Sequence, residues 1–180
     1  DGKKRAYING VYAGQQPVNI SSDIKVDAVT FIRDFPKEKY STTVLPFDVN
    51  TENVEGLDAV LRYNGIKTVN GVSSIRMKVV WATDKWVETN DIRDEKNNLV
   101  HYNHADLTAN TPYLVLMNDA SFKLKSGAFP LTLKETVPAE VSIDGWTFRG
   151  TWKYKKWGPS CSTKEQNCDP ETGFAYGFAA

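Results

Sequence analysis

The sequence predicts an all-β protein built as an antiparallel β-sandwich, with the jelly roll as one form of that architecture. Short segments alternate between apolar and polar residues, and turn-forming residues separate these segments at intervals of roughly ten residues. Apolar residues with helical spacing are scarce. Aromatic residues make up 12% of the chain, which supplies bulk for a core between two sheets. Many short strands with regular turns are typical of sandwiches and jelly rolls.

Length and composition indicate one ordinary globular domain over residues 1–180, with 41% apolar and 24% charged residues. Lys plus Arg equals Asp plus Glu at 22 each, so the formal net charge is zero. Proteins that bind a phosphate backbone normally carry a basic excess, so we expect no nucleic-acid partner. Because no apolar run approaches the ~20 residues of a membrane helix, we also expect no membrane insertion.

Twelve segments have the composition of strands. In chain order they cover residues 6–8, 11–12, 25–33, 41–49, 59–63, 66–69, 74–82, 113–117, 122–125, 131–134, 146–155 and 174–178. Pro46 predicts an edge strand or a bulge within 41–49. Asn64-Gly65 predicts a hairpin turn, and Asn70-Gly71 leads into the strand 74–82.

Two of these segments alternate clearly. In 74–82, one face is expected to hold Ile75, Met77, Val79 and Trp81, opposite Arg76 and Lys78. In 146–155, the apolar face is expected to hold Trp146, Phe148, Gly150, Trp152 and Tyr154. One buried and one exposed face is typical of an antiparallel sheet.

The pattern is less clear in two segments. Residues 51–62 could hold a turn or two of helix, although Gly56 weakens that interpretation. Residues 83–109 form the longest irregular stretch, which we expect to be a polar loop. Loops of that length usually bind a ligand or are mobile.

Cys161 and Cys168 lie in one polar loop bounded by prolines. Two thiols that close a short surface loop favour a disulfide, and with it an oxidising compartment. The alternative is a pair of free surface thiols. A structural zinc site would need two further ligands, and the two His residues lie about sixty residues upstream.

The chain ends suggest a module cut from a larger secreted protein. Residues 1–5 are polar and no apolar stretch follows them, so a signal peptide is expected upstream of this sequence. Residues 174–180 are apolar, which predicts a buried final strand with further chain after it. We therefore expect a secreted or cell-surface location.

Candidate metal ligands are weak. His101 and His104, with Asp106 nearby, could meet at a metal ion only in a turn. An oxygen-rich loop could hold calcium through Asp91, Asp94, Glu95, Asn97 and Asn98. An EF-hand starting at Asp48 is excluded, because Asn53 and Ala59 stand where Gly and Glu are required. For both groups the favoured interpretation is polar residues in solvated loops, so no metal ion or other cofactor is predicted, with calcium as the alternative.

Catalysis has little support, and the chain is predicted not to be an enzyme. There is no Gly-x-Ser-x-Gly nucleophile elbow, and neither His has a recognisable triad context. Glycoside hydrolysis needs two carboxylates that are paired in space, which the sequence cannot exclude. The candidates all lie in one loop, which is a weak basis: Glu88, Asp91, Asp94 and Glu95. A glycan-active enzyme remains the least favoured alternative.

Three aromatic residues do not fit an inward-facing position, namely Trp86, Tyr102 and Trp157. Trp86 lies among charges and Trp157 falls on the polar face of its strand, just before the cysteine loop. Exposed aromatic rings at loop ends suit stacking on sugar rings, so these three are the predicted ligand-binding residues. The alternative is that each ring caps one end of the sandwich.

Four motifs resemble those of a known domain: TTVLPFDV at 42–49, ANTPYLV at 109–115, GTWKY at 150–154 and GFAYGFA at 173–179. They occur in order along most of the chain. The domain that they resemble is a β-rich unit of large modular extracellular proteins in Fibrobacter and Bacteroides-type gut and rumen bacteria. The resemblance implies a surface location and a fibre-degrading or gut habitat, and it transfers no catalytic residue.

These observations favour a non-catalytic binding module of an extracellular modular protein, with a polysaccharide or another surface glycan as ligand. The alternative is a structural or adhesive surface domain, such as an adhesin, spacer or filament subunit, without a small ligand. Its partners would be neighbouring domains or copies of itself, paired through the Pro46 segment or the last strand.

Overall fold

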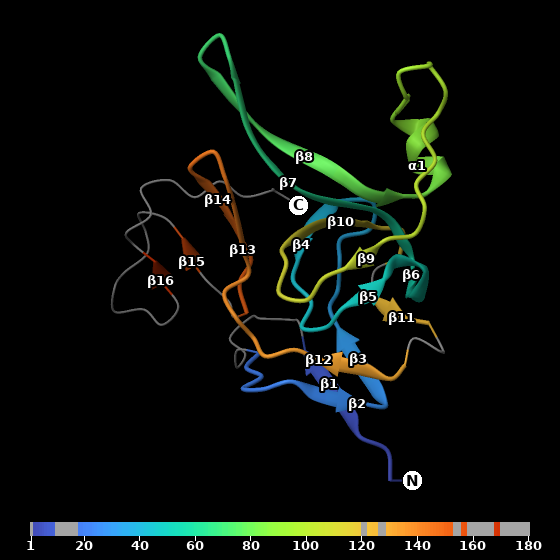
Figure 1. Cartoon of the computed structure of the whole chain (residues 1–180), viewed down its shortest axis with the longest axis vertical. Helices are drawn as coiled ribbons and strands as arrows, with labels where there is room; N and C mark the ends of the chain where they lie inside the picture. Colours follow the sequence, from blue (N-terminus) through green and yellow to red (C-terminus); the bar gives the residue numbers. More distant parts are fainter. Residues whose placement is uncertain are drawn as a thin grey trace.

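A computed structural model describes residues 2–8, 18–119, 122–125 and 129–152, and the backbone alone of 9, 156–157 and 168–169. The structure is mostly β, with several small, mainly antiparallel sheets around one sheet of four strands (Figure 1). The predicted dominance of antiparallel β structure is therefore confirmed. Among the described residues no helix is long and apolar enough to cross a membrane.

The elements follow one another closely along the chain. In order they are β1 (Arg5–Asn9), β2 (Ile24–Val26), β3 (Ala28–Ile32), β4 (Tyr40–Thr43), β5 (Val49–Asn50), the 3-10 turn η1 (Thr51–Asn53), β6 (Val54–Glu55), β7 (Leu57–Val69), β8 (Val72–Ala82), α1 (Asp84–Thr89), β9 (Asp106–Leu107), β10 (Tyr113–Met117), β11 (Lys123–Leu124), β12 (Leu131–Leu133), β13 (Glu140–Ile143), β14 (Trp146–Arg149), β15 (Lys156–Trp157) and β16 (Cys168–Asp169).

The four-stranded sheet has the order β4-β10-β7-β8 and is antiparallel throughout. Its central strand β10 is apolar along its whole length because both faces of the sheet are covered. Tyr113, Val115 and Met117 pack into one buried cluster. Leu114 and Leu116 pack on the opposite face into a second cluster.

The first cluster, here called the main core, lies between this sheet and the strands β1, β2, β3 and β12. Its centre is aromatic. The Phe31 ring meets the rings of Phe47 and Phe122 edge-on, with centroids 6.1 and 5.5 Å away. Edge-to-face pairs are favourable arrangements of aromatic rings. Contrary to the antiparallel expectation, β1 and β3 at this side pair in parallel.

The second cluster, the helix-side core, covers the other face of the sheet. It joins Ala59, Leu61 and Leu114 of the sheet to Trp86 and Val87 of α1. Helix α1 lies inside the segment 83–109 that was expected to be irregular, so that expectation is wrong for its first part.

Helix α1 begins where the side chain of Thr83 caps it. The Thr83 hydroxyl accepts a hydrogen bond from the backbone N–H of Trp86 at 3.2 Å and donates one to the Asp58 carboxylate at 2.5 Å. The second bond links the start of the helix to Asp58, the second residue of β7. Six residues give little helical periodicity in the sequence, and the helix is held by burying Trp86 and Val87.

The first Asn-Gly pair is not a turn. Strand β7 runs straight through Asn64-Gly65, and the hairpin closes at the second pair, where Asn70 and Gly71 have φ angles of 51° and 77°. Two consecutive positive φ angles are those of a type I′ turn. At the first pair, the register passes from Tyr63↔Met77 to Ile66↔Ile75, so two residues face one. Asn64-Gly65 is therefore a β-bulge.

A second bulge alters the faces of β8. Val60 pairs with Trp81 and Leu61 pairs with Val79, which leaves Val80 as the extra residue. Trp81 consequently packs into the main core, while Met77 and Val79 pack against the helix-side core. The expectation that all of these side chains share one face is wrong, because a bulge reverses the alternation beyond it.

Three other sequence expectations need correction. The segment 41–49 is not one continuous strand. Its first part belongs to β4, which is an edge strand of the four-stranded sheet and ends at Thr43. Pro46 lies beyond β4 and is buried, and its carbonyl accepts the N–H of Lys134 at 2.7 Å. In 51–62 only η1 is helical, and the remainder is strand apart from Gly56. In 146–155, β14 ends at Arg149 and Trp146 is 46% exposed rather than inward-facing.

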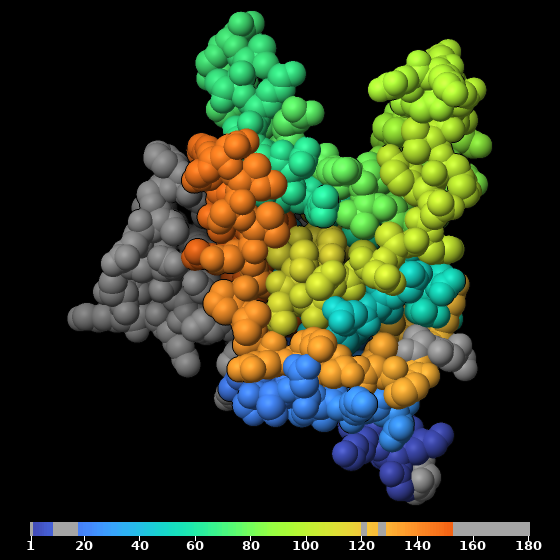
Figure 2. Space-filling view, viewed as in Figure 1, coloured from blue at the N-terminus to red at the C-terminus, as the bar shows by residue number. Residues whose placement is uncertain are grey.

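The strands β7 and β8 extend beyond the sheet as a two-stranded arm, here defined as residues 64–78. In Figure 2 the tip of the arm projects from the body of the molecule. The segment around α1 forms a second projection, and an open gap separates the two. The expected strands at 11–12 and 174–178 lie outside the residues that the structure describes.

Candidate functional site

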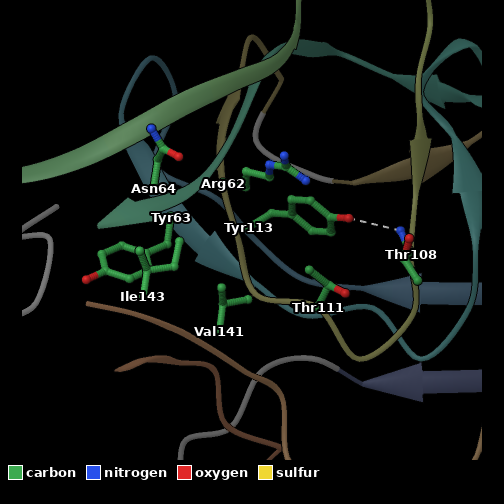
Figure 3. Close-up of a pocket in the computed structure, with 8 residues that line it drawn as sticks. All are labelled: Arg62, Tyr63, Asn64, Thr108, Thr111, Tyr113, Val141 and Ile143. Carbon is green, nitrogen blue, oxygen red and sulfur yellow. Dashed lines mark hydrogen bonds between the residues drawn. The ribbon is translucent and has the colours of Figure 1, made fainter. Parts of the chain in front are cut away.

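A pocket of about 380 Å³ opens where β7, the chain before β10 and the hairpin β13–β14 meet. Figure 3 shows the side chains that surround it. Its lining comprises Arg62, Tyr63, Asn64, Thr108, Thr111, Tyr113, Val141 and Ile143.

The pocket exists because β10 is shorter than β7. Strand β10 begins at Tyr113, which pairs with Arg62, so the edge of β7 beyond Arg62 has no strand partner on that side. The hairpin β13–β14 packs there instead. Gly65 permits the approach, because a Cβ atom at that position would lie 3.2 Å from Cγ2 of Ile143. The bulge in β7 thus builds one wall of the pocket.

That wall is apolar. The Tyr63 ring is stacked on the Phe148 ring, with centroids 5.7 Å apart and planes 18° apart. Val141 and Ile143 of β13 are half-buried beside it. The Tyr63 hydroxyl is buried without a hydrogen-bond partner among the described residues. Its burial raises the pKa of Tyr63, and the negative charge of Asp144 adds to the effect.

The rim is polar. The backbone N–H of Thr108 donates to the Tyr113 hydroxyl at 3.0 Å, which leaves the Tyr113 hydrogen available to a ligand (Figure 3). Arg62, Asn64 and Thr108 are exposed. Arg62 is the single charged residue in the lining, and it has no ion pair within the described part of the chain. A ligand here would meet a guanidinium group, an amide and hydroxyls around an apolar wall.

The predicted binding residues lie elsewhere. Trp86 is only 7% exposed, and its indole N–H donates to the Tyr40 hydroxyl at 3.0 Å. The expectation that Trp86 is an exposed stacking platform is wrong: its charged neighbours face solvent while the ring fills the helix-side core. Tyr102 is half-buried and packs against both cores.

For Trp157 the structure describes only the backbone, in β15, where it pairs in parallel with Asp169 of β16. The side chain lies outside the described residues. So does Cys161, while Cys168 is described by its backbone alone. The disulfide between Cys161 and Cys168 therefore stays a prediction.

The two His residues do not converge. His101 Nδ1 lies 2.7 Å from the Asp84 carboxylate, at the start of α1. His104 Nδ1 lies 3.1 Å from the Thr51 hydroxyl, and its ring is stacked on Trp81 at 5.4 Å. The hypothesis of a metal site shared by both His residues is therefore not supported by their geometry. In the described ranges no group of three or more His, Cys, Asp or Glu residues could hold a metal ion.

In the oxygen-rich loop, residues 91–98, the carboxylates of Asp91 and Asp94 bind groups of the same loop. Asp94 accepts the backbone N–H groups of Asn98 and Lys96 at 2.8 and 2.9 Å. The Asn98 bond is the main reason that the pKa of Asp94 is lowered. Asp91 forms an ion pair with Arg93 at 2.7 Å. Asp91 and Asp94 therefore take part in contacts within the loop itself.

Sequence reasoning missed Arg62, Tyr63 and Asn64 as site residues. The signal that could have found them is the Asn64-Gly65 pair, which lies inside an otherwise strand-forming run. Comparison of the chain with known protein families, curated proteins and solved structures gave no match.

Proposed function

We propose that this chain is a non-catalytic carbohydrate-binding module of a secreted or cell-surface modular protein, and that the pocket beside β13 is its ligand site. The observation that carries the proposal is the amphipathic lining: an apolar wall of Tyr63, Val141 and Ile143 faces a rim of hydrogen-bonding groups. A sugar ring has the matching character, with C–H groups on its faces and hydroxyls around its edge.

The size of the pocket supports the proposal. Small-molecule sites are concave, have volumes of roughly 300–1,000 Å³ and combine apolar lining with a few polar groups. At about 380 Å³ the pocket is at the small end of that range, suited to one or two sugar rings. Polysaccharide chains present such units in succession at a surface.

The lining also favours binding over catalysis. Its eight residues include no Asp, Glu, His or Cys. Glycoside hydrolysis canonically needs two carboxyl groups on either side of the scissile bond, and no such pair lines the pocket.

We further propose that the small sheets together form a β-sandwich. The main core supports this arrangement, because it lies between the four-stranded sheet on one side and β1, β2, β3 and β12 on the other. The resemblance of the motifs at 42–49 and 109–115 to a domain of modular extracellular proteins supports the surface location.

The test is retention of the domain on a panel of insoluble polysaccharides, followed by calorimetry with soluble oligosaccharides of those retained. Asn64→Ala removes a rim amide and should weaken binding by about tenfold, since one hydrogen bond to a ligand is of the order of 1.4 kcal/mol. Lys85→Ala on α1, far from the pocket along the chain, is the matched control and should bind as the parent does.

Absence of binding to every polysaccharide would contradict the proposal. Equal affinity of the parent and the Asn64→Ala variant would mean that the ligand binds at a site other than this pocket.

The second candidate is the structural or adhesive domain, and one observation favours it. The arm carries two exposed apolar side chains at its tip, Val69 and Val72, which are 50% and 68% exposed. The Pro46 segment no longer supports this candidate, because Pro46 is buried. Sedimentation velocity tests it: a module that assembles through the arm would increase in size with concentration, and Val69→Ser with Val72→Ser would abolish the increase.

A further inference from the structure

The arm and the strand residues at its base are basic, in a chain whose formal net charge is zero overall. Residues 59–83 contain four cations and no Asp or Glu, whereas the whole chain has 22 basic and 22 acidic residues. The four cations are Arg62, Lys67, Arg76 and Lys78.

The strand register places all four on one face. Lys78 pairs with Arg62 across β7 and β8, and paired residues share a face. Along β8, Arg76 lies two residues from Lys78 and therefore on the same face. Ser74 continues that face and pairs with Lys67 of β7. The single extra residue of the Asn64-Gly65 bulge restores Lys67 to the side of Arg62.

This basic face is exposed and unneutralised. All four cations are exposed. Within the part of the chain that the structure describes, none of them forms an ion pair or a side-chain hydrogen bond. Arg62 and Lys78 stand directly opposite each other, an arrangement in which like charges repel. An anion placed between them would relieve that repulsion.

The opposite face of the arm has a different character. There Thr68 and Ser73 are hydrogen-bonded at 2.8 Å, and further toward the body Met77 and Val79 pack against the helix-side core. The charge is therefore confined to the side of the arm that continues into the pocket through Arg62.

We propose that the ligand is an acidic polysaccharide, whose uronic acid residues run from the pocket along the basic face of the arm. The inference rests on the proposed function and names its substrate class. One sugar occupies the pocket with its carboxylate at Arg62, and following carboxylates meet Lys78, Arg76 and Lys67. An Arg guanidinium binds a carboxylate in a two-pronged geometry, and Lys acts as a point charge.

The length of the arm suits a chain ligand. From the Arg62↔Lys78 pair to the Val69↔Val72 pair the face spans about seven residues, or roughly 20 Å at the rise of a β-strand. Each exposed ion pair is weak in water, so affinity would come from several pairs acting together on one chain.

An anionic lipid bilayer is the competing occupant, and the arm fits it less well. Helices and loops that enter the bilayer interface rely on Trp, Phe and Leu. The arm ends in two valines and carries its cations along a flat side rather than around its tip.

The experiment compares polygalacturonate with the same polymer after reduction of its carboxyl groups, which removes charge and keeps the backbone. The test variant is Lys67→Gln, Arg76→Gln, Lys78→Gln, and the matched control is Lys37→Gln, Lys85→Gln, Lys96→Gln, which removes the same charge from other exposed positions. Thermal unfolding of each variant confirms its fold.

The parent should bind polygalacturonate at least about tenfold more tightly than the reduced polymer, and the arm variant should lose about that factor while the control keeps it. Raising the salt from about 50 to about 300 mM should weaken binding of the acidic polymer alone.

Equal affinity for both polymers, or an arm variant that binds polygalacturonate like the parent, would overturn the inference and leave the carbohydrate-binding function standing. Absence of binding to both polymers and to the whole polysaccharide panel would overturn both. Arm-dependent binding to phosphatidylserine vesicles without binding to polygalacturonate would assign the basic face to a membrane and also overturn the inference.

Discussion

Gly65 of β7 and Ile143 of β13 lie so close together that a Cβ atom on Gly65 would come within 3.2 Å of the Ile143 Cγ2 atom. Gly65 has a φ angle of 90°, a conformation that other residues adopt only with strain. The bulge at Asn64-Gly65 therefore lets the β13–β14 hairpin close one side of the pocket.

The first prediction concerns this contact. Gly65→Ala should lower the free energy of unfolding by about 2–4 kcal/mol, since it adds backbone strain and a steric conflict with Ile143. Gly71→Ala is the control: Gly71 also has a positive φ, but a Cβ atom there would meet nothing within 4 Å. It should cost only about 1 kcal/mol. Urea unfolding measures both, and equal losses would show that the Ile143 contact contributes nothing.

The second prediction concerns the unpaired hydroxyl of Tyr63. Tyr63→Phe keeps the ring on Phe148 and removes a buried oxygen that has no partner among the described residues. We expect the free energy of unfolding to rise by about 1 kcal/mol, because an unsatisfied buried hydroxyl is costly. A loss of stability instead would mean that the hydroxyl has a partner.

In the parent, whose Tyr63 pKa is raised by burial, the free energy of unfolding should fall as the pH rises above about 10. The Phe variant should lose less over the same range.

The third prediction separates structure from binding at Trp86. Trp86→Ala should destabilise the protein by about 3–5 kcal/mol, because it empties the helix-side core. Tyr40→Phe keeps the packing but leaves the indole N–H without its acceptor, at a cost of about 1–3 kcal/mol. Under conditions in which Tyr40→Phe remains folded, its affinity for oligosaccharide should equal that of the parent. If folded Tyr40→Phe bound oligosaccharide more weakly than the parent, the region around Trp86 would be part of the binding site.

The fourth prediction is a loss of stability in acid. The pKa of Asp23 is lowered by hydrogen bonds that the carboxylate accepts, the strongest from the Lys134 side chain and the next from the backbone N–H of Glu135. The pKa of Asp94 is lowered mainly by the hydrogen bond from the backbone N–H of Asn98. A lowered folded-state pKa stabilises the fold above the unfolded value of about 4, and this contribution disappears as the pH falls through the folded value. Urea unfolding between about pH 5 and pH 2 should show the decline. The double variant Asp23→Asn, Asp94→Asn should show a shallower one, and an unchanged slope would contradict the assignment.

The sequence by itself determined the class of the fold. The strand-forming segments 113–117 and 131–134 became β10 and β12, and Asn70-Gly71 became the turn of the long hairpin. These are local properties: side-chain period, β-propensity and positive φ act within a few residues of chain.

Only the tertiary structure decided how those segments meet. Asn64-Gly65 has the same local chemistry as Asn70-Gly71, yet it became a bulge, against which Ile143, more than seventy residues away, packs. Trp86 is flanked by charged residues in the sequence, yet its ring is buried because it packs on the apolar face of the four-stranded sheet. The pocket joins residues from β7, β10 and β13 that no spacing connects, since a site between strands depends on register and packing over the whole chain.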